Sequence, residues 1–168
     1  MQTANSIYIA APLERIVQLA YEVERWPELL PHYRWVTVLS REGNRKTVEM
    51  AARRGRFPVK WRAVQDLDQS GPTPVVRFRH IGGVTRGMEV AWTFAPDAHG
   101  VKVRIDHDFA PPWPVVGNFV ANRIIGPMFI ANIAGKTLAH IKAIAEAASN
   151  EPVAATSPVM AHQPEGGT

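Results

Sequence analysis

Two histidines stand where an imidazole could act on a bound molecule. His80 ends a run in which Val76 and Phe78 point to the same side of the chain. His107 shares a face with Ile105 in a later run of the same kind. A buried imidazole needs a hydrogen-bond partner, because an unpaired polar group inside a protein costs about 1–3 kcal/mol. Each histidine is therefore either a structural residue bonded within the protein or a partner for a ligand carbonyl or hydroxyl.

The sequence lacks the motifs of several common catalytic and binding sites. There is no cysteine for a disulfide, a thiol nucleophile or a thiolate metal site. The Gly82-Gly83 pair precedes no helix and indicates a turn, not a phosphate loop. The histidines lack metal-helix spacing, and alternation turns the carboxylates beside His107 away from its ring. We expect no metal and no cofactor, and an enzyme of this kind would work by positioning and polarising its substrate.

Large apolar side chains share the predicted faces of the two histidines. Aromatic residues at strand spacing are most often core, but apolar walls with a few polar groups also make a small-molecule site. We expect Trp26, Tyr33 and Trp113 at its rim, because they lie in or beside proline-bounded connections. The residues predicted to face a ligand are Trp26, Trp35, Trp61, Phe78, Met88, Val90, Trp92, Phe109, Trp113, Phe119, Phe129 and Ile133.

The elements that would position these residues are mostly strands. Residues 6–10 read as a short strand, followed by an amphipathic helix at 12–23 and a short helix at 24–31. Six runs with two-residue alternation then follow, with turn residues and no helix between them, which predicts an antiparallel meander. The six runs are residues 34–42, 46–54, 57–68, 75–81, 87–95 and 101–109.

A helical stretch closes the pattern. Gly126-Pro127 interrupts it, so we predict a helix at 114–125, a break, and a main helix at 127–148. Ile133 belongs to the apolar stripe of the main helix, which must pack against the concave face of the sheet. A sheet curved around one helix seldom fills its own interior, so we expect an apolar pocket there. Residues 114–125 would form a movable wall of that pocket.

Length and composition suit one domain. We expect it to span residues 1–148 of the 168, and the Pro- and Ala-rich segment 149–168 to be disordered. The chain has no run of about 20 uncharged apolar residues and no signal-peptide pattern, which favours the cytoplasm. The net charge is +4, and the basic residues of 53–62 favour a solvated outer face of the sheet. Peripheral contact with an acidic membrane surface is the alternative, and a nucleic-acid partner is not expected.

Three segments resemble a known superfamily. They are IAAPLERIVQLAYEVERWPELLPHYRWVTVL at 9–39, MEVAWTFAPDAHGVKVRIDHDF at 88–109 and NIAGKTLAHIKAIAE at 132–146. Over about residues 5–147 the chain resembles the START/SRPBCC superfamily, and within it the polyketide cyclase/dehydrase group with its coenzyme Q-binding START-type proteins. The resemblance implies an α+β helix-grip fold, in which a seven-stranded curved antiparallel sheet surrounds a long C-terminal helix.

The resemblance implies three outcomes for function. We expect a carrier or chaperone for a hydrophobic molecule such as a lipid, an isoprenoid quinone or a polyketide. The alternative is an aromatase/cyclase, which promotes aldol cyclisation and dehydration and would use His80, His107, Tyr33 and Arg86. An arginine inside the pocket characterises such cyclases, whereas Arg62 alternates outward here. A ribosome-associated toxin is the third outcome, and the basic segment 53–62 is its only support. The sequence does not indicate an oligomeric state.

Overall fold

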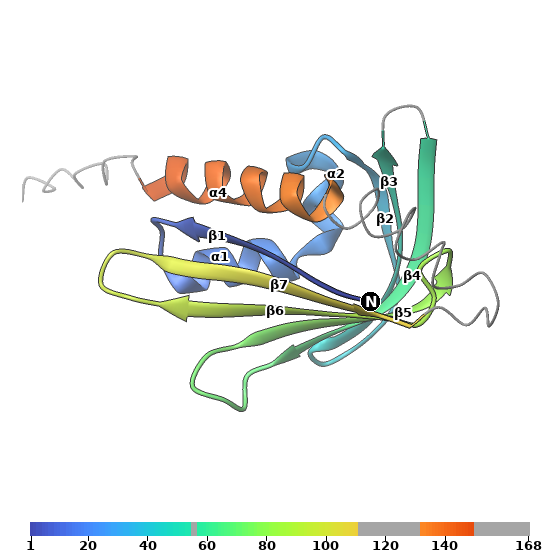
Figure 1. Cartoon of the computed structure of the whole chain (residues 1–168), viewed down its shortest axis with the longest axis horizontal. Helices are drawn as coiled ribbons and strands as arrows, with labels where there is room; N and C mark the ends of the chain where they lie inside the picture. The colour runs from blue at the N-terminus through green and yellow to red at the C-terminus, as the bar shows by residue number, and fades with distance from the viewer. Residues whose placement is uncertain (55–56, 111–131, 150–168) are drawn as a thin grey trace, which may run out of the picture.

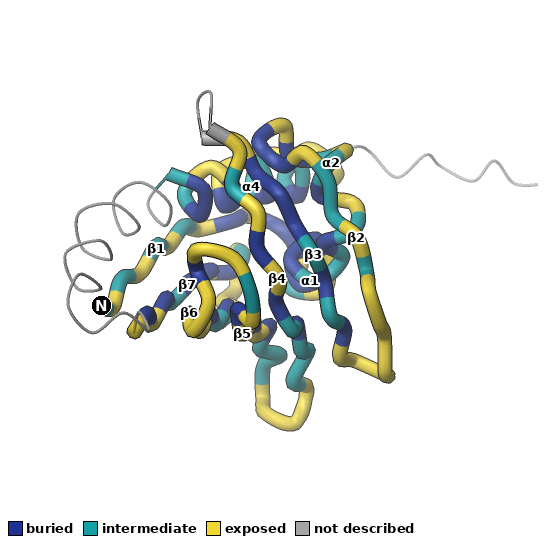
Figure 2. The backbone as a smooth tube through the Cα atoms, turned by 90° about the vertical axis from the view of Figure 1, so that its right-hand side faces the viewer, coloured by how far each residue is buried: buried dark blue, intermediate teal, exposed yellow. Residues whose placement is uncertain are grey.

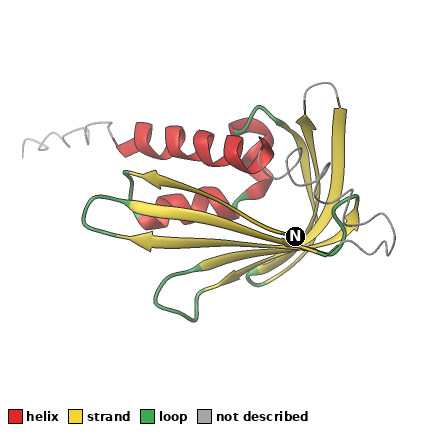
Figure 3. Cartoon of the chain, in the orientation of Figure 1, coloured by secondary structure: helices red, strands yellow, loops and turns green. Residues whose placement is uncertain are grey.

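Seven antiparallel strands form one strongly curved sheet (Figures 1 and 3). The structure is a computed structural model, which describes residues 1–54, 57–110 and 132–149. The fold is α+β, as predicted. Its strands are β1 (Gln2–Ile9), β2 (Tyr33–Glu42), β3 (Arg45–Arg54), β4 (Phe57–Asp68), β5 (Val75–Gly83), β6 (Met88–Pro96) and β7 (Val101–Phe109). Its helical elements are α1 (Leu13–Tyr21), the 3-10 turn η1 (Val23–Arg25), α2 (Trp26–Leu29) and α4 (Gly135–Ser149).

The strand order is β1-β7-β6-β5-β4-β3-β2. Strands β2 to β7 form the predicted meander, in which each strand pairs with the next. β1 pairs along its whole length with β7, from Gln2 opposite Asp108 to Ile9 opposite Val101. This pairing explains why β1 begins four residues before the strand expected at 6–10. The helical segment α1-η1-α2 then carries the chain from one edge of the sheet to the other.

The faces of the strands alternate as predicted. Along β6, Met88, Val90, Trp92 and Phe94 are buried and the residues between them are not. β7 follows the same rule with Val101, Val103, Ile105, His107 and Phe109. Figure 2 shows this alternation of buried and accessible residues along the strands. The buried set forms the concave face of the sheet, because side chains at every second position share one side.

The segment α1-η1-α2 covers part of the concave face. α1 buries Ile16, Val17, Leu19 and Ala20 along one stripe. The indole Nε1 of Trp26 donates a hydrogen bond to the carbonyl of Leu19 at 2.8 Å. Lys46 of β3 is almost fully buried, and its ammonium donates to the Glu24 carboxylate at 2.7 Å and the Tyr21 carbonyl at 2.8 Å. These bonds tie the segment to the sheet and fix the position of Trp26.

α4 lies beside β1 and α1 (Figure 1). It buries Thr137, Leu138, Ile141 and Ala145, and a π-helical turn at 132–134 precedes it. The helix predicted at 127–148 is thus present over its described part, and it extends one residue further to Ser149. The predicted helix at 114–125 and residues 150–168 of the expected tail lie outside the described residues. None of the helices in the described part of the chain has both the length and the apolar character needed to cross a bilayer.

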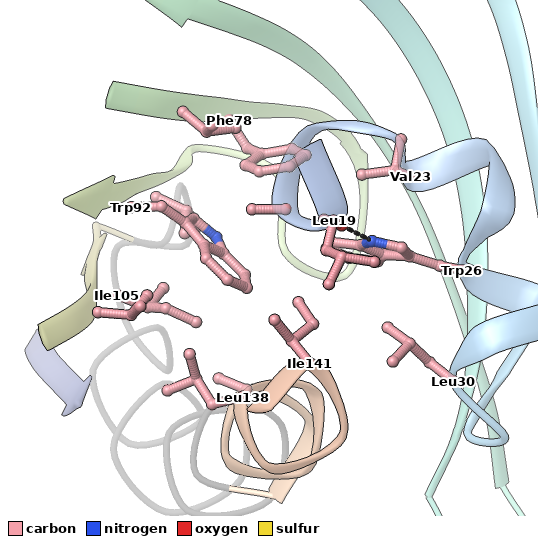
Figure 4. Close-up of a cluster of buried hydrophobic side chains, with 14 of the residues drawn as sticks. Leu19, Val23, Trp26, Leu30, Phe78, Trp92, Ile105, Leu138 and Ile141 are labelled. Atoms are coloured by element: carbon pink, nitrogen blue, oxygen red, sulfur yellow. Dashed lines mark hydrogen bonds between the residues drawn. The ribbon is translucent and has the colours of Figure 1, made fainter. Parts of the chain in front are cut away.

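Side chains from the sheet, α1, α2 and α4 meet in one core. Figure 4 shows Phe78 and Trp92 of the sheet directed toward Trp26 of α2, with Leu138 and Ile141 of α4 closing the cluster from the opposite side. The closing helix therefore buries its stripe against the concave face of the sheet, as its periodicity predicted.

Candidate functional site

A cavity of about 60 Å³ lies between the concave face of the sheet, α2 and the beginning of α4. Most of its wall is apolar or aromatic, and four polar side chains interrupt the wall. The lining residues are Trp26, Tyr33, Met50, Trp61, Phe78, His80, Met88, Val90, Trp92, Ile105, His107, Ile133, Ala134 and Thr137. A wider hollow of about 440 Å³ lies elsewhere, but ionic groups such as Arg77, Glu89 and Arg104 line it. The smaller cavity therefore has the composition of a small-molecule site.

Aromatic rings hold the shape of this cavity. The ring centroid of Trp26 lies 4.8 Å from that of Tyr33, in an edge-on arrangement, and 6.1 Å from that of Trp92. The Trp61 ring stacks on the His80 imidazole at 6.1 Å, with an angle of 8° between the planes. Such pairs stabilise a fold beyond their buried area by about 0.5–1.5 kcal/mol each. The walls are consequently rigid where the sheet and α2 meet.

Two histidines form one polar end of the cavity. Burial, together with the nearby His107, lowers the pKa of His80 from 6.5 to about 3. Burial also lowers the pKa of His107, to about 4, against the opposing effect of Asp106. Both imidazoles are therefore neutral at neutral pH. The His80 Nδ1 lies 2.7 Å from the Thr85 hydroxyl, whereas the buried Nδ1 of His107 has no hydrogen-bond partner among the described residues.

Tyr33, Thr137 and His32 form a second polar group, where β2 meets α4. The Thr137 hydroxyl donates to the Ile133 carbonyl at 2.8 Å, and its oxygen lies 2.9 Å from the Nε2 of His32. Because that hydroxyl proton is already used, the His32 Nε2 is the donor to the Thr137 oxygen. Burial raises the pKa of Tyr33, and a hydrogen bond with Thr137 partly offsets this. This network fastens the beginning of α4 to the sheet.

The cavity brings together ten of the residues predicted from the sequence. They are Trp26, Tyr33, Trp61, Phe78, His80, Met88, Val90, Trp92, His107 and Ile133. Phe109 is buried but does not line the cavity, and Arg86 is exposed in the turn between β5 and β6. Three further predicted residues, Trp113, Phe119 and Phe129, lie outside the described residues.

Trp35 lies on the opposite side of the sheet from the cavity. A regular strand would place Tyr33 and Trp35 on one face, but the register skips a residue, so that Tyr33 pairs with Ala52 and Trp35 with Ala51. This bulge turns Trp35 to the outer face, where the Lys60 ammonium lies 5.5 Å from its ring centroid. Alternation alone could not show the bulge, because the extra residue leaves no mark on the apolar pattern.

Sequence reasoning missed four lining residues: Met50, Ile105, Ala134 and Thr137. Ile105 shares a strand face with His107, so the alternation along the strand was enough to predict that Ile105 lines the cavity. Thr137 carried a different signal, because it is a polar residue within the apolar stripe of the last helix. No sequence pattern pointed to His32 or Thr85, since both lie outside the regular elements or at their ends.

The comparisons with known proteins agree with this architecture. Residues 9–127 match the family model described as polyketide cyclase / dehydrase and lipid transport. The chain belongs to this family. A Streptomyces cyaneus protein named "Putative polyketide cyclase" is 32% identical over 116 residues, which cover 67% of this chain and 76% of that protein.

Solved structures share the fold at low sequence identity. The Zhui aromatase/cyclase from Streptomyces sp. R1128 superposes with a TM-score of 0.76 at 16% identity, over 90% of this chain and 96% of that one. A STAR-related lipid transfer protein from Xanthomonas axonopodis gives 0.62 at 13% identity, over 85% and 84% of the two chains. The family fold thus occurs in proteins named as cyclases and in one named as a lipid transfer protein.

Proposed function

We propose that the protein binds a hydrophobic small molecule with oxygen functions, of the polyketide or quinone kind, between the sheet and α4. The buried Nδ1 of His107 carries the proposal. It belongs to a histidine that lines the aromatic cavity, and it has no partner among the described residues. Such an atom costs about 1–3 kcal/mol until a hydroxyl, a carbonyl or water bonds to it. A ligand that brings this partner and fills the apolar space gains from both effects.

The size of the cavity requires movement on binding. Its volume of about 60 Å³ is far below the roughly 300–1,000 Å³ of sites for drug-sized ligands. The sheet walls are held by strand pairing along their length, whereas the wall at residues 133–137 is held to the sheet by the bond between Thr137 and His32. We therefore expect this wall to shift when a ligand enters, with that bond broken or rearranged. Hydrogen exchange should therefore change most at residues 132–140 when ligand binds.

The binding test uses purified protein and defined probes. Organic extraction followed by mass spectrometry identifies a co-purified ligand, and titration with a short-chain ubiquinone, oleic acid and a hydroxyanthraquinone follows tryptophan fluorescence. We expect His107→Phe, which keeps a ring but removes the nitrogens, to weaken binding of the oxygenated probes about tenfold, which corresponds to about 1.4 kcal/mol. His99→Asn is the matched control, because His99 is exposed. An empty protein that binds none of the three probes contradicts the proposal.

Cyclase activity is the second candidate, and the two neutral histidines favour it over simple transport. In an aldol cyclisation a base removes a proton from an acidic carbon, which then adds to a carbonyl carbon. The carbonyl oxygen takes up a proton and becomes a hydroxyl group, which then leaves as water together with a proton from the adjacent carbon. The N–H of a neutral imidazole can donate to the carbonyl oxygen. The lowered pKa values of both rings make them weak bases, so the removal of the carbon proton falls to another group.

The cyclase test compares product patterns. A reactive poly-β-ketone is generated by a polyketide synthase with and without the protein, and the products are separated by chromatography. We expect the protein to increase one cyclised aromatic product, and His80→Ala or Tyr33→Phe to lower its share while the fold is retained. Unchanged products in the presence of the protein contradict cyclase activity but leave the binding proposal intact.

A further inference from the structure

Thr85 is fully buried although it lies in an exposed turn. It sits between β5 and β6, where its neighbour Val84 is 51% exposed and Arg86 is also exposed. Three backbone bonds set the turn: Gly87 N–H to the His80 carbonyl at 2.9 Å, Met88 N–H to the Thr85 carbonyl at 3.0 Å, and Arg86 N–H to the Gly83 carbonyl at 3.2 Å. This frame directs the Thr85 side chain inward, where its hydroxyl meets the His80 Nδ1 at 2.7 Å.

Two glycines allow the turn to sit close to the neighbouring strand. Gly83 has φ +82°, and a Cβ there would lie 2.4 Å from the Lys60 carbonyl oxygen and 2.9 Å from the Trp61 Cα. Gly87, with φ +90°, takes the chain into β6. Because the turn packs directly on the backbone at Trp61, the indole that stacks on His80 and the hydroxyl that bonds it come from one rigid unit.

The donor in the hydrogen bond between Thr85 and His80 follows from the partners that each buried group needs. A neutral imidazole carries one proton, on Nδ1 or on Nε2. If Nδ1 donated to Thr85, the buried hydroxyl proton would have no acceptor among the described residues, at a cost of about 1–3 kcal/mol. If the hydroxyl donates to Nδ1, both the Thr85 hydroxyl proton and the Nδ1 atom have a partner. The proton of the ring is then on Nε2.

We propose that Thr85 is a positioning residue that holds the proton of His80 on Nε2, so that His80 offers the cavity an N–H donor. The ring lines the cavity and its plane is fixed by Trp61, which leaves Nε2 to meet a ligand. His80 then polarises a ligand carbonyl and stabilises negative charge on its oxygen, and the role of base falls to another group. The role of His80 in polarising a ligand rests on the proposed function. The position of the proton on Nε2 does not depend on it.

The test reads the tautomer directly in ligand-free protein. Long-range proton–nitrogen correlation spectra of uniformly nitrogen-15-labelled protein distinguish Nδ1–H from Nε2–H imidazoles, and His80→Gln assigns the signals. We expect wild-type His80 as the Nε2–H form. Thr85→Val keeps the shape of the side chain but removes the hydroxyl, so it should yield the Nδ1–H form or a mixture. Thr85→Ser should retain the wild-type pattern, and Val84→Ala, in the same turn, is the matched control.

Two results overturn the assignment. One is a wild-type His80 that carries its proton on Nδ1. The other is an unchanged Nε2–H form in a folded Thr85→Val protein. If Thr85→Val does not fold, the wild-type spectrum still decides between the tautomers, and Thr85→Ser still shows whether the hydroxyl is enough. Neither readout needs a ligand, so a failure of the proposed function is seen separately, in the binding and product assays.

Discussion

The two faces of the sheet carry different kinds of polar residues, although the same strands form both. On the outer face, Glu49 accepts from Lys60 at 3.0 Å and from Arg62 at 2.6 Å, and Arg104 pairs with Asp106 at 2.7 Å. On the inner face, the polar residues that line the cavity are two histidines, a tyrosine and a threonine, all neutral at neutral pH. Desolvation explains why the polar groups of the cavity wall are neutral, because a charge is costly away from water. The buried ammonium of Lys46, outside the cavity, is compensated by its bond to Glu24.

The largest difference in stability between the two faces is expected for two adjacent residues of β4. Trp61 is buried on the inner face and Arg62 is half-exposed on the outer face. We expect Trp61→Ala to lower the free energy of unfolding by about 3–5 kcal/mol, because it removes a large core ring and leaves a cavity. Arg62→Ala should have an effect too small to change the unfolding midpoint clearly, because its ion pair is in water. Urea denaturation of both variants measures the contrast, and equal losses would contradict it.

The contact between the sheet and α4 is the next target. Thr137→Val keeps the side-chain volume but leaves Tyr33 and His32 without their shared oxygen. We expect a loss of about 1–3 kcal/mol, the cost of unpaired buried groups. The matched control Thr137→Ser retains the hydroxyl and should lose much less. The measurement is urea denaturation, with hydrogen exchange at 132–140 as a local readout. Equal losses in both variants would mean that the methyl group, not the hydrogen bonds, matters.

The neutral histidines make the stability of the fold depend on pH. The pKa of His80 falls from 6.5 to about 3 on folding, so below pH 6.5 the unfolded chain binds a proton that the folded state does not. Stability is therefore full above pH 6.5 and decreases as the pH falls toward 3, by about 1 kcal/mol per pH unit for such a group. His107 contributes in the same direction down to about pH 4.

Unfolding free energies measured between pH 7 and pH 4 check this dependence. His80→Gln should make the decline shallower by about 1 kcal/mol per pH unit. A stability that rises toward pH 4 would contradict a neutral inner face.

The smallest effect is expected on the outer face itself. Hydrogen bonds from Arg62 and then Lys60, together with their charges, lower the pKa of the Glu49 carboxyl. Glu49→Gln should therefore cause a slight loss of stability at low ionic strength, which disappears in about 1 M salt because exposed charges are screened. Thermal unfolding at two salt concentrations measures it. A loss that persists in high salt would show that the carboxylate does more than pair with its neighbours.

Local sequence patterns were enough for much of the site. Alternation in β5, β6 and β7 placed Phe78, His80, Trp92 and His107 on one face, and all four line the cavity. The same rule failed at Trp35, where a bulge reverses the face. It also had no means to find Thr85, whose burial depends on a turn that folds back onto β4.

The sequence by itself determined the order of the elements and the face that each regular strand buries, because these depend on periods of two and 3.6 residues and on turn residues. Three segments, at 9–39, 88–109 and 132–146, carried the family resemblance. The tertiary structure alone decided the volume of the cavity, the bulge at Trp35, the bond from Thr85 to His80 and the network through Thr137. These features depend on how separate elements approach one another, and a difference of one residue in register or a few tenths of an ångström in packing changes them without altering the local pattern.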